Sequence, residues 1–502
     1  MPKTLNIAVI GAGTMAQAVH LPVLRRRWDR FAVSALVDHS ERRRRESAEL
    51  WGVAEDRRYT TVGDLIAAVK AKTLSLDAAV LATDGLHVED LLLLLKRGIP
   101  VLVEPPLGYS AAEVARIADF ERMTGRPLVM MAYPQQYDDS VARMAESIAA
   151  KDLRMVDHEV LMPASQPLFG AAHVTASSYD LPGEVRTARR TALHEAVKAG
   201  SGDAATQRDR DLYVKGLLTG LAHQLAVLEA TYGPLARIVG VRHWPKSVIP
   251  GSIELWGELE KGAQVRLVWH YLPFAPEYVE RIEVLSARRR MLVELPAPSH
   301  GDQRSTLSLR EKKAGTVQVT ETVAGKGSAE AMWEAFHAFV DKGTAPLSGS
   351  ASALAMVEQL REMLATIVEA DGRSIDPTPE ELAAAEAEAE AAVESEPEAG
   401  AGADPEDTAD AGESSIAEPA DRDTDAEEPA AAAPAAGAVA PALPPEGEEI
   451  VDVWDIDAAT DPEAPADRPE VDPETTAHHE ESATAPEVPA ADDLRERPAP
   501  GA

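Results

Sequence analysis

A glycine-rich turn near the start of the chain has the residue types and spacing that bind a phosphate group. Gly11, Gly13 and Ala16 form a G-x-G-x-x-A pattern between the apolar run LNIAVI and an expected helix. The first glycine allows a tight turn, the second lets a phosphate approach the backbone amides, and the alanine allows close packing. Thr14 and Met15 lie inside the turn and are expected to contact the same ligand. The turn therefore predicts dinucleotide binding.

An acidic residue at the end of the next apolar run indicates which dinucleotide would bind. FAVSALVD ends on Asp38, 22 residues after Ala16. A carboxylate at this place accepts hydrogen bonds from the ribose hydroxyls and repels a 2′-phosphate, which favours NAD. The arginines from Arg42 to Arg45 follow closely, and a guanidinium there could hold that phosphate. NADP therefore remains the alternative cofactor.

Charge and composition narrow the classes of function. The chain of 502 residues has a net charge of −35, and residues 377–502, with 37 acidic and 4 basic side chains, contribute almost all of it. Because the preceding part is nearly neutral, no nucleic-acid-binding surface is predicted. The absence of cysteine excludes disulfides and thiolate metal sites. The sequence shows no signal peptide and no apolar run of membrane-spanning length, so a soluble cytoplasmic protein without membrane contact is expected.

The order of the apolar segments predicts two folded domains. In residues 1–132, strand-like runs alternate with helical patterns, which indicates an α/β Rossmann domain that binds NAD(P). In residues 133–376, strand-like segments follow one another after a helical stretch, which indicates an α+β domain with a mostly antiparallel sheet. We expect this second domain to bind substrate and mediate oligomerisation. Its two closing helices are expected to pack back on the first domain.

The end of the chain has a different composition. Residues 377–502 are rich in Ala, Pro, Glu and Asp and lack periodic apolar segments. Such a segment does not bury enough surface to offset the entropy of ordering, so an acidic, disordered tail is predicted. The aromatic stretch EEIVDVWDID suggests a docking motif for a protein partner, whereas a solvated tail is the simpler interpretation.

Four longer segments carry a recognisable pattern: GAGTMA, AVLATDGLHVEDLLLLLKRGIPVLVEPPLGYS, LLTGLAHQLAVLEATYG and PLSGSASALAMVEQL. Together they resemble the Gfo/Idh/MocA family of NAD(P)-dependent sugar and cyclitol dehydrogenases, over about residues 5–376. The resemblance implies a Rossmann domain followed by an α+β domain, a small-molecule substrate and a homo-oligomer. It also implies that the nicotinamide lies near Thr83, His87 and Glu104.

Two positions that are catalytic in this family hold other residues in this chain. The family strand usually ends in Glu-Lys-Pro, whereas Pro105 and Pro106 follow Glu104 here, so the lysine is missing. The family helix usually carries Asp-x-x-x-His, and here Thr219 precedes His223 by four residues. A positioned acid or base contributes about 10² to 10⁴ in rate, so ordinary sugar oxidation should suffer severely.

One lysine offers a replacement for the missing cation. Lys215, Thr219 and His223 are spaced by four residues, which places them within about an 80° arc on an α-helix. If this face is turned to the cofactor, the three residues form the candidate catalytic set. The simpler interpretations are a solvated lysine and a histidine packed between domains. His158 and His194 are interpreted as surface or packing residues.

The sequence supports no metal site and leaves two functions open. The nearest candidate, DHE at residues 157–159, lies on an expected strand, where neighbouring side chains alternate faces. The first function is an NAD(P)-dependent oxidoreductase that transfers a hydride to or from a hydroxyl, carbonyl or conjugated group. The second is a catalytically inactive, nucleotide-binding sensor or interaction protein, which the altered catalytic positions and the acidic tail favour.

Overall fold

The computed structural model describes residues 3–378, apart from residue 84 and most of residues 165–179, together with residue 383. Nearly all of the predicted tail, residues 377–502, lies outside the described residues. Within the described part, no helix combines the length and the apolar character needed to cross a membrane.

Six parallel strands form the first sheet, in the order β3-β2-β1-β4-β5-β6. This is the doubly wound order of a Rossmann fold, in which the chain extends the sheet first to one side of β1 and then to the other. The predicted Rossmann sheet is therefore confirmed. Folds of this type bind ligands at the carboxyl ends of the strands next to this switch. The strands are β1 (Leu5–Ile10), β2 (Phe31–Val37), β3 (Arg58–Tyr59), β4 (Ala78–Leu81), β5 (Val101–Val103) and β6 (Val129–Met131).

Helical segments connect these strands, and their first residues explain where several of them begin. Ser40, Thr61 and Ser110 accept a hydrogen bond from a backbone amide in the first turn of α2, α3 and α5. Gly52 and Gly125 end α2 and α5 with positive φ, which glycine adopts without strain. The elements are η1 (Ala16–His20), α1 (Leu21–Arg26), α2 (Glu41–Trp51), η2 (Glu55–Arg57), α3 (Val62–Lys70), α4 (Val88–Leu95) and α5 (Ala111–Thr124).

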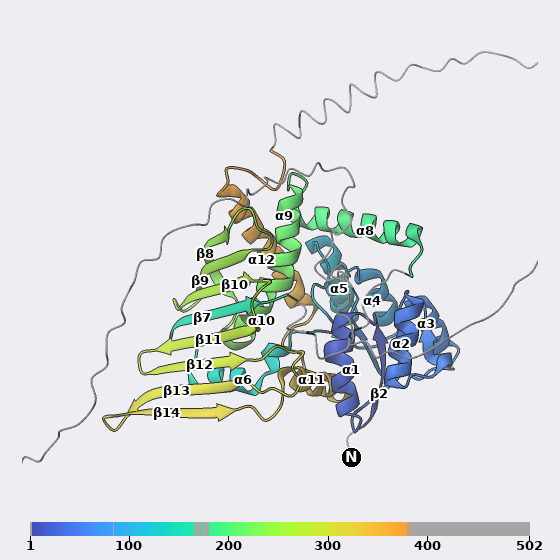
Figure 1. Ribbon diagram of the computed structural model, residues 1–502, viewed down its shortest axis with the longest axis horizontal. Coiled ribbons are helices and arrows are strands. Elements are labelled where there is room, and N and C mark those ends of the chain that lie inside the picture. The colour runs from blue at the N-terminus through green and yellow to red at the C-terminus, as the bar shows by residue number, and fades with distance from the viewer. Residues whose placement is uncertain are drawn as a thin grey trace, which may run out of the picture. The chain divides into compact units, whose positions relative to one another are not determined.

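The second sheet has eight strands in the order β14-β13-β12-β11-β7-β10-β9-β8, and Figure 1 shows them side by side. Only the β7–β10 pair is parallel, so the predicted, mostly antiparallel sheet is confirmed. Residues 1–132 and 133–376 remain our proposed domains. The strands are β7 (Leu153–Met162), β8 (Leu235–Trp244), β9 (Ser252–Leu259), β10 (Gln264–Tyr271), β11 (Val279–Ser286), β12 (Arg289–Leu295), β13 (Thr306–Lys313) and β14 (Thr316–Val323).

Helical elements cover one face of the second sheet. Gly220 packs so closely on the buried Trp269 that a Cβ at this glycine would come within 2.7 Å of the indole. The Gln224 amide donates to the carbonyls of His158 and Val268, which ties the following helix to β7 and β10. The elements between the two sheets and over the second are η3 (Pro134–Tyr137), α6 (Asp139–Ser147), α8 (Gly183–Ser201), α9 (Gln207–Asp211), η4 (Leu212–Leu221) and α10 (Ala222–Tyr232).

The two closing helices pack on elements of the Rossmann sheet. α11 (Ser328–Lys342) contacts α1, and its Trp333 and Phe336 are fully buried there. His337 on the same helix contacts the Lys3 carbonyl at 2.7 Å. α12 (Ser350–Glu369) packs along α5, and it also contacts η4 and β8. The end of the described chain therefore holds the two sheets together.

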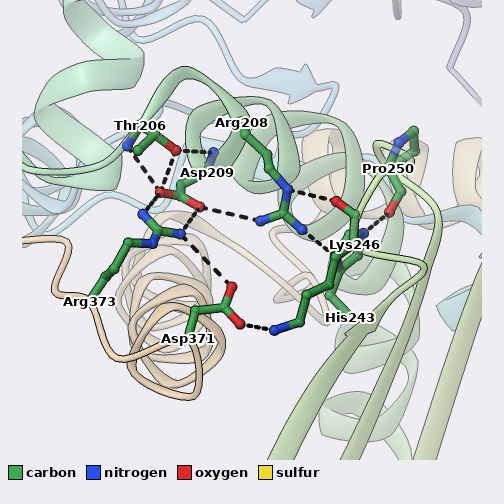
Figure 2. A network of polar contacts seen from close by, with 8 residues as sticks. All are labelled: Thr206, Arg208, Asp209, His243, Lys246, Pro250, Asp371 and Arg373. Carbon is green, nitrogen blue, oxygen red and sulfur yellow. Dashed lines mark hydrogen bonds and ion pairs between the residues drawn. The ribbon is translucent and has the colours of Figure 1, made fainter.

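A polar network anchors the end of α12 (Figure 2). The fully buried Asp209 accepts two hydrogen bonds from Arg373, at 2.6 and 2.9 Å, and one from the Thr206 hydroxyl at 2.6 Å. Asp371 pairs with Lys246, which follows β8. Burial alone would raise the pKa of Asp209, but these donors lower it to about 2.

We expect Asp209→Asn to lower the free energy of unfolding by about 2 kcal/mol near neutral pH, because the Arg373 guanidinium loses its charged partner. The folded-state pKa lies below the ordinary value of 3.8, so the stabilisation is present above that value and disappears as the pH falls toward 2. Urea denaturation near neutral pH and at about pH 3 should show the difference between the two proteins shrinking.

The matched control is Asp203→Asn, because Asp203 is exposed and pairs with Lys198 only at 3.8 Å. This change should alter stability by less than about 0.5 kcal/mol. A difference for Asp209→Asn that stays constant with pH would contradict the assigned role of the ion pair.

Candidate active site

The glycine turn follows β1 and passes directly over the end of β4. Gly11 has a φ of +88°, and a Cβ there would lie 2.4 Å from the Ala82 carbonyl oxygen. Its amide donates to the Val37 carbonyl at the end of β2. Only glycine fits this conformation and this approach, as the sequence predicted.

The far side of the turn is open. A Cβ on Gly13 would meet only the Arg43 guanidinium, at 3.8 Å. Thr14 and Met15 are half-buried and begin the helix, and the fully buried Ala16 starts its π-helical part, η1. Backbone amides at this helix start can face a pyrophosphate, which is the arrangement that the G-x-G-x-x-A pattern predicts.

Asp38 is fixed against this turn. One carboxylate oxygen accepts a hydrogen bond from the Ala12 amide at 2.8 Å, and the other accepts one from the Ser40 amide at 2.8 Å. Arg43 lies 3.4 Å from the second oxygen, and only 6% of Asp38 is exposed. Each carboxylate oxygen can accept two hydrogen bonds, so capacity remains for a ribose hydroxyl.

Thr83 and His87 form a polar pair after β4. The Thr83 hydroxyl lies 2.8 Å from Nδ1 of His87, and His87 is buried at the start of α4. Both residues therefore lie at the edge of the sheet where the sequence analysis placed the nicotinamide. Their assigned role in cofactor binding stays a prediction.

Glu104 lies buried after β5 and is oriented by two residues from distant parts of the chain. Nε2 of His20 lies 2.7 Å from the Glu104 carboxylate, and the Trp333 indole N–H donates to Nδ1 of His20 at 3.2 Å. Because an indole N–H only donates, Nδ1 must accept, and the ring proton therefore sits on Nε2 and points at Glu104. The next two residues, Pro105 and Pro106, are joined by a cis peptide bond.

Tyr133 and His223 meet beside this carboxylate. Tyr133 follows β6, and its ring contacts His223 edge-to-face, with centroids 5.1 Å apart. Burial lowers the pKa of His223, which the charges of Glu104 and Glu280 oppose only in part. Nδ1 of His223 is buried and forms no hydrogen bond with another described residue. The imidazole is therefore neutral near pH 7 and can accept a proton.

A second buried carboxylate lies on the inner face of the second sheet. Glu280 on β11 is 2.9 Å from Nε2 of His158 on β7, and it accepts hydrogen bonds from Tyr278 at 2.5 Å and Gln135 at 3.3 Å. Burial alone would raise the pKa of Glu280, but these partners lower it, so it is ionised. Its charge also acts on His223. The charges of two buried carboxylates, Glu104 and Glu280, therefore act on this histidine.

The other two residues of the predicted catalytic set lie in a segment that is not α-helical. Residues 212–221 form the π-helix η4, and with their spacing of four residues Lys215, Thr219 and His223 are all half-buried among buried neighbours. The Thr219 hydroxyl donates to the carbonyls of Val214 and Lys215, at 2.8 and 3.0 Å. Lys215 is half-buried and takes part in an interaction with another group of the chain. The catalytic roles of Lys215 and Thr219 stay predictions.

The sequence analysis missed several residues of this site. His20 lies seven residues after Gly13, one or two helical turns into the expected helix, and this spacing was the available signal. His158 was interpreted as a surface or packing residue, and the structure places it buried, with Nε2 2.9 Å from the Glu280 carboxylate. Tyr133 carried no signal beyond its place directly after an apolar run. Among the described residues, no group of three or more His, Cys, Asp or Glu could hold a metal ion.

Comparison with known proteins agrees with this geometry. Residues 5–133 match the family model GFO_IDH_MocA, an oxidoreductase family with an NAD-binding Rossmann fold, so the predicted resemblance is confirmed. The inositol 2-dehydrogenase of Arthrobacter sp. (strain FB24) is 30% identical over 177 residues, which are 34% of this chain and 49% of that protein. The inositol 2-dehydrogenase of Corynebacterium glutamicum (strain R) is 28% identical over 160 residues, 31% and 45% of the two chains. The chain thus spans about half the length of the curated relatives it matches.

Solved structures extend the similarity to both sheets. A 3-ketoreductase from Actinomadura kijaniata in complex with NADP superposes with a TM-score of 0.52 and 15% identity, over 75% of this chain and 100% of that one. UDP-N-acetylglucosamine 3-dehydrogenase from Acidithiobacillus ferrooxidans gives a TM-score of 0.52 and 13% identity, over 73% and 98%. At these identities the similarity concerns the fold alone.

We expect His20→Phe to lower the free energy of unfolding by about 2 kcal/mol. Phenylalanine keeps the edge contact with Trp333, which has ring centroids 5.7 Å apart, but leaves the buried Glu104 without its donor. Urea denaturation measures the loss. His194→Phe on the exposed face of α8 is the control, and an equal loss in both variants would contradict the assigned role of His20.

Proposed function

We propose that this chain, a member of the Gfo/Idh/MocA oxidoreductase family through residues 5–133, is an NAD-dependent dehydrogenase or reductase that acts on a hydroxyl or carbonyl group of a small, sugar-like molecule. One observation carries the proposal. The glycine turn with Asp38 lies at the same edge of the Rossmann sheet as the polar group around Glu104 and His223. The names of the sequence relatives, inositol 2-dehydrogenases, support the substrate class.

The residues present fit a dinucleotide. The open side of Gly13 would receive the pyrophosphate, and Asp38 would accept hydrogen bonds from the adenosine ribose. Thr83 and His87 would line the nicotinamide end. When bound, the nicotinamide supplies the hydride acceptor or donor.

His223 is the proposed acid–base group. In the oxidising direction, the substrate carbon gives up a hydride and the hydroxyl gives its proton to the neutral imidazole, so a carbonyl remains. In the reducing direction the protonated imidazole returns that proton to the oxygen. Glu104 and Glu280 stabilise the imidazolium that forms, because both charges favour the protonated ring. Tyr133, packed against the same ring, would orient the substrate oxygen.

A nucleotide-binding protein without turnover is the second candidate. Pro105 stands where relatives of this family carry the catalytic lysine, and the Thr219 hydroxyl is engaged by its own helix. These two observations favour a site that binds the dinucleotide but oxidises polyols poorly. Both candidate functions predict dinucleotide binding, so a measurement of catalytic turnover distinguishes them.

The first test is calorimetric titration of the full chain with NADH, followed by turnover of NAD with a panel of cyclitols and sugars. We expect a dissociation constant on the order of micromolar. Gly13→Asp should weaken binding by about 100-fold or more, because the new carboxylate meets the pyrophosphate while the fold tolerates its Cβ. Gly183→Asp, at the start of α8 with open space around it, is the control. Equal binding by the two variants would overturn the proposed cofactor site.

The second test concerns His223. We expect His223→Asn to lower kcat for oxidation by about 10² to 10⁴ while NADH binding stays unchanged. In the unaltered protein, the neutral, proton-accepting form of His223 predominates above its lowered pKa. Oxidation should therefore persist at pH 6.5 and decrease only at lower pH. The pH profile of kcat measures this. A variant that keeps the full rate would exclude His223 as the base.

A further inference from the structure

A carboxylate from a distant part of the chain covers the start of α2. Asp180 accepts hydrogen bonds from the Ser40 hydroxyl, at 2.8 and 3.0 Å to its two oxygens, and from the Arg42 amide at 2.8 Å. It lies 138 residues beyond Arg42 in sequence and shortly before α8. The helix start is already capped within its own segment, because the Ser40 hydroxyl accepts from the Arg43 amide at 3.0 Å.

This contact adjoins the proposed ribose-binding residue. The same Ser40 donates its amide to Asp38 at 2.8 Å and its hydroxyl to Asp180, so the two carboxylates flank one residue. Arg43 extends over this place, 3.4 Å from Asp38 and next to Gly13. A phosphate on the 2′ oxygen of a ribose held by Asp38 would need these donors: the Ser40 hydroxyl, the Arg42 amide and the Arg43 guanidinium.

We propose that Asp180 is a specificity-determining residue, which selects NAD(H) over NADP(H) by placing its carboxylate where the adenosine 2′-phosphate would bind. The inference rests on the proposed function, because it concerns the same dinucleotide site. It explains how a chain with several arginines after Asp38 favours NAD. The donors suited to a phosphate are present, and Asp180 takes two of them.

The carboxylate carries its charge near neutral pH. Asp180 is exposed, and although loss of some hydration raises the pKa of its carboxyl, the Arg42 amide, the Ser40 hydroxyl and the Arg43 charge together lower it. A second anion at this place, such as a 2′-phosphate, would therefore find these donors occupied and would be repelled by the charge of Asp180. The 2′-hydroxyl of NAD, in contrast, is neutral and donates to Asp38.

A purely structural role for Asp180 predicts something different. A carboxylate at a helix start stabilises the helix through the helix dipole. Its loss would then lower the stability of α2 and weaken both dinucleotides alike. The ratio of the two affinities therefore separates the two roles.

The experiment is calorimetric titration of NADH and NADPH into the full chain and its variants. We expect Asp180→Ala to tighten NADPH binding about 10-fold or more and to change NADH binding by less than about 2-fold. Asp180→Asn, which removes the charge but keeps an acceptor, should fall between. Adding Arg43→Ala to Asp180→Ala should remove the gain for NADPH.

Asp203→Ala, an exposed aspartate beyond α8, is the matched control and should leave both affinities unchanged. An NADPH to NADH affinity ratio that is the same in Asp180→Ala and the unaltered protein overturns the role of Asp180 and leaves the proposed function intact. A preference of the unaltered protein for NADPH also overturns it. Failure of every protein to bind either dinucleotide overturns the proposed function, and this inference with it.

Discussion

The hydrogen bond between His20 and Glu104 is the interaction on which the site depends. A carboxylate this deeply buried needs a donor, and His20 reaches it only because Trp333 holds the opposite ring nitrogen. The three residues come from η1, the end of β5 and α11, so the closing part of the described chain completes a site begun by the first strands. The packing of α11 on α1 therefore also orients the Glu104 carboxylate.

Two consecutive prolines fix the backbone next to Glu104. Pro105 and Pro106 end β5 and force the preceding residue into extended geometry, which keeps the Glu104 carboxylate beside His20. Proline, however, has no group that donates or accepts a proton. In the proposed function the proton is therefore transferred by His223, on which the charges of Glu104 and Glu280 act.

Local sequence patterns predicted the helices and strands well, but they did not predict contacts between residues far apart in the sequence. Alternating apolar runs and helices sufficed for the Rossmann sheet, and Gly11 was predictable because its conformation is a local matter. The π-helical form of η4 was not predictable from the spacing of Lys215 and Thr219, because the same four-residue spacing also fits an α-helix. His158 and Glu280 are separated by 122 residues, so no sequence pattern could pair them.

The residues proposed to bind the dinucleotide and those proposed to transfer a proton come from different parts of the chain. The residues proposed to hold the dinucleotide follow β1, β2 and β4, whereas the groups around His223 come from β5, β6, α10 and the second sheet. In the proposed function, residues 105 and 219 therefore belong with the groups for proton transfer and not with those that hold the dinucleotide. Asp180 lies within residues 133–376 but contacts the residues proposed to hold the dinucleotide, through Ser40. Cofactor choice thus depends on a residue that no inspection of the glycine turn and its flanking strands would identify.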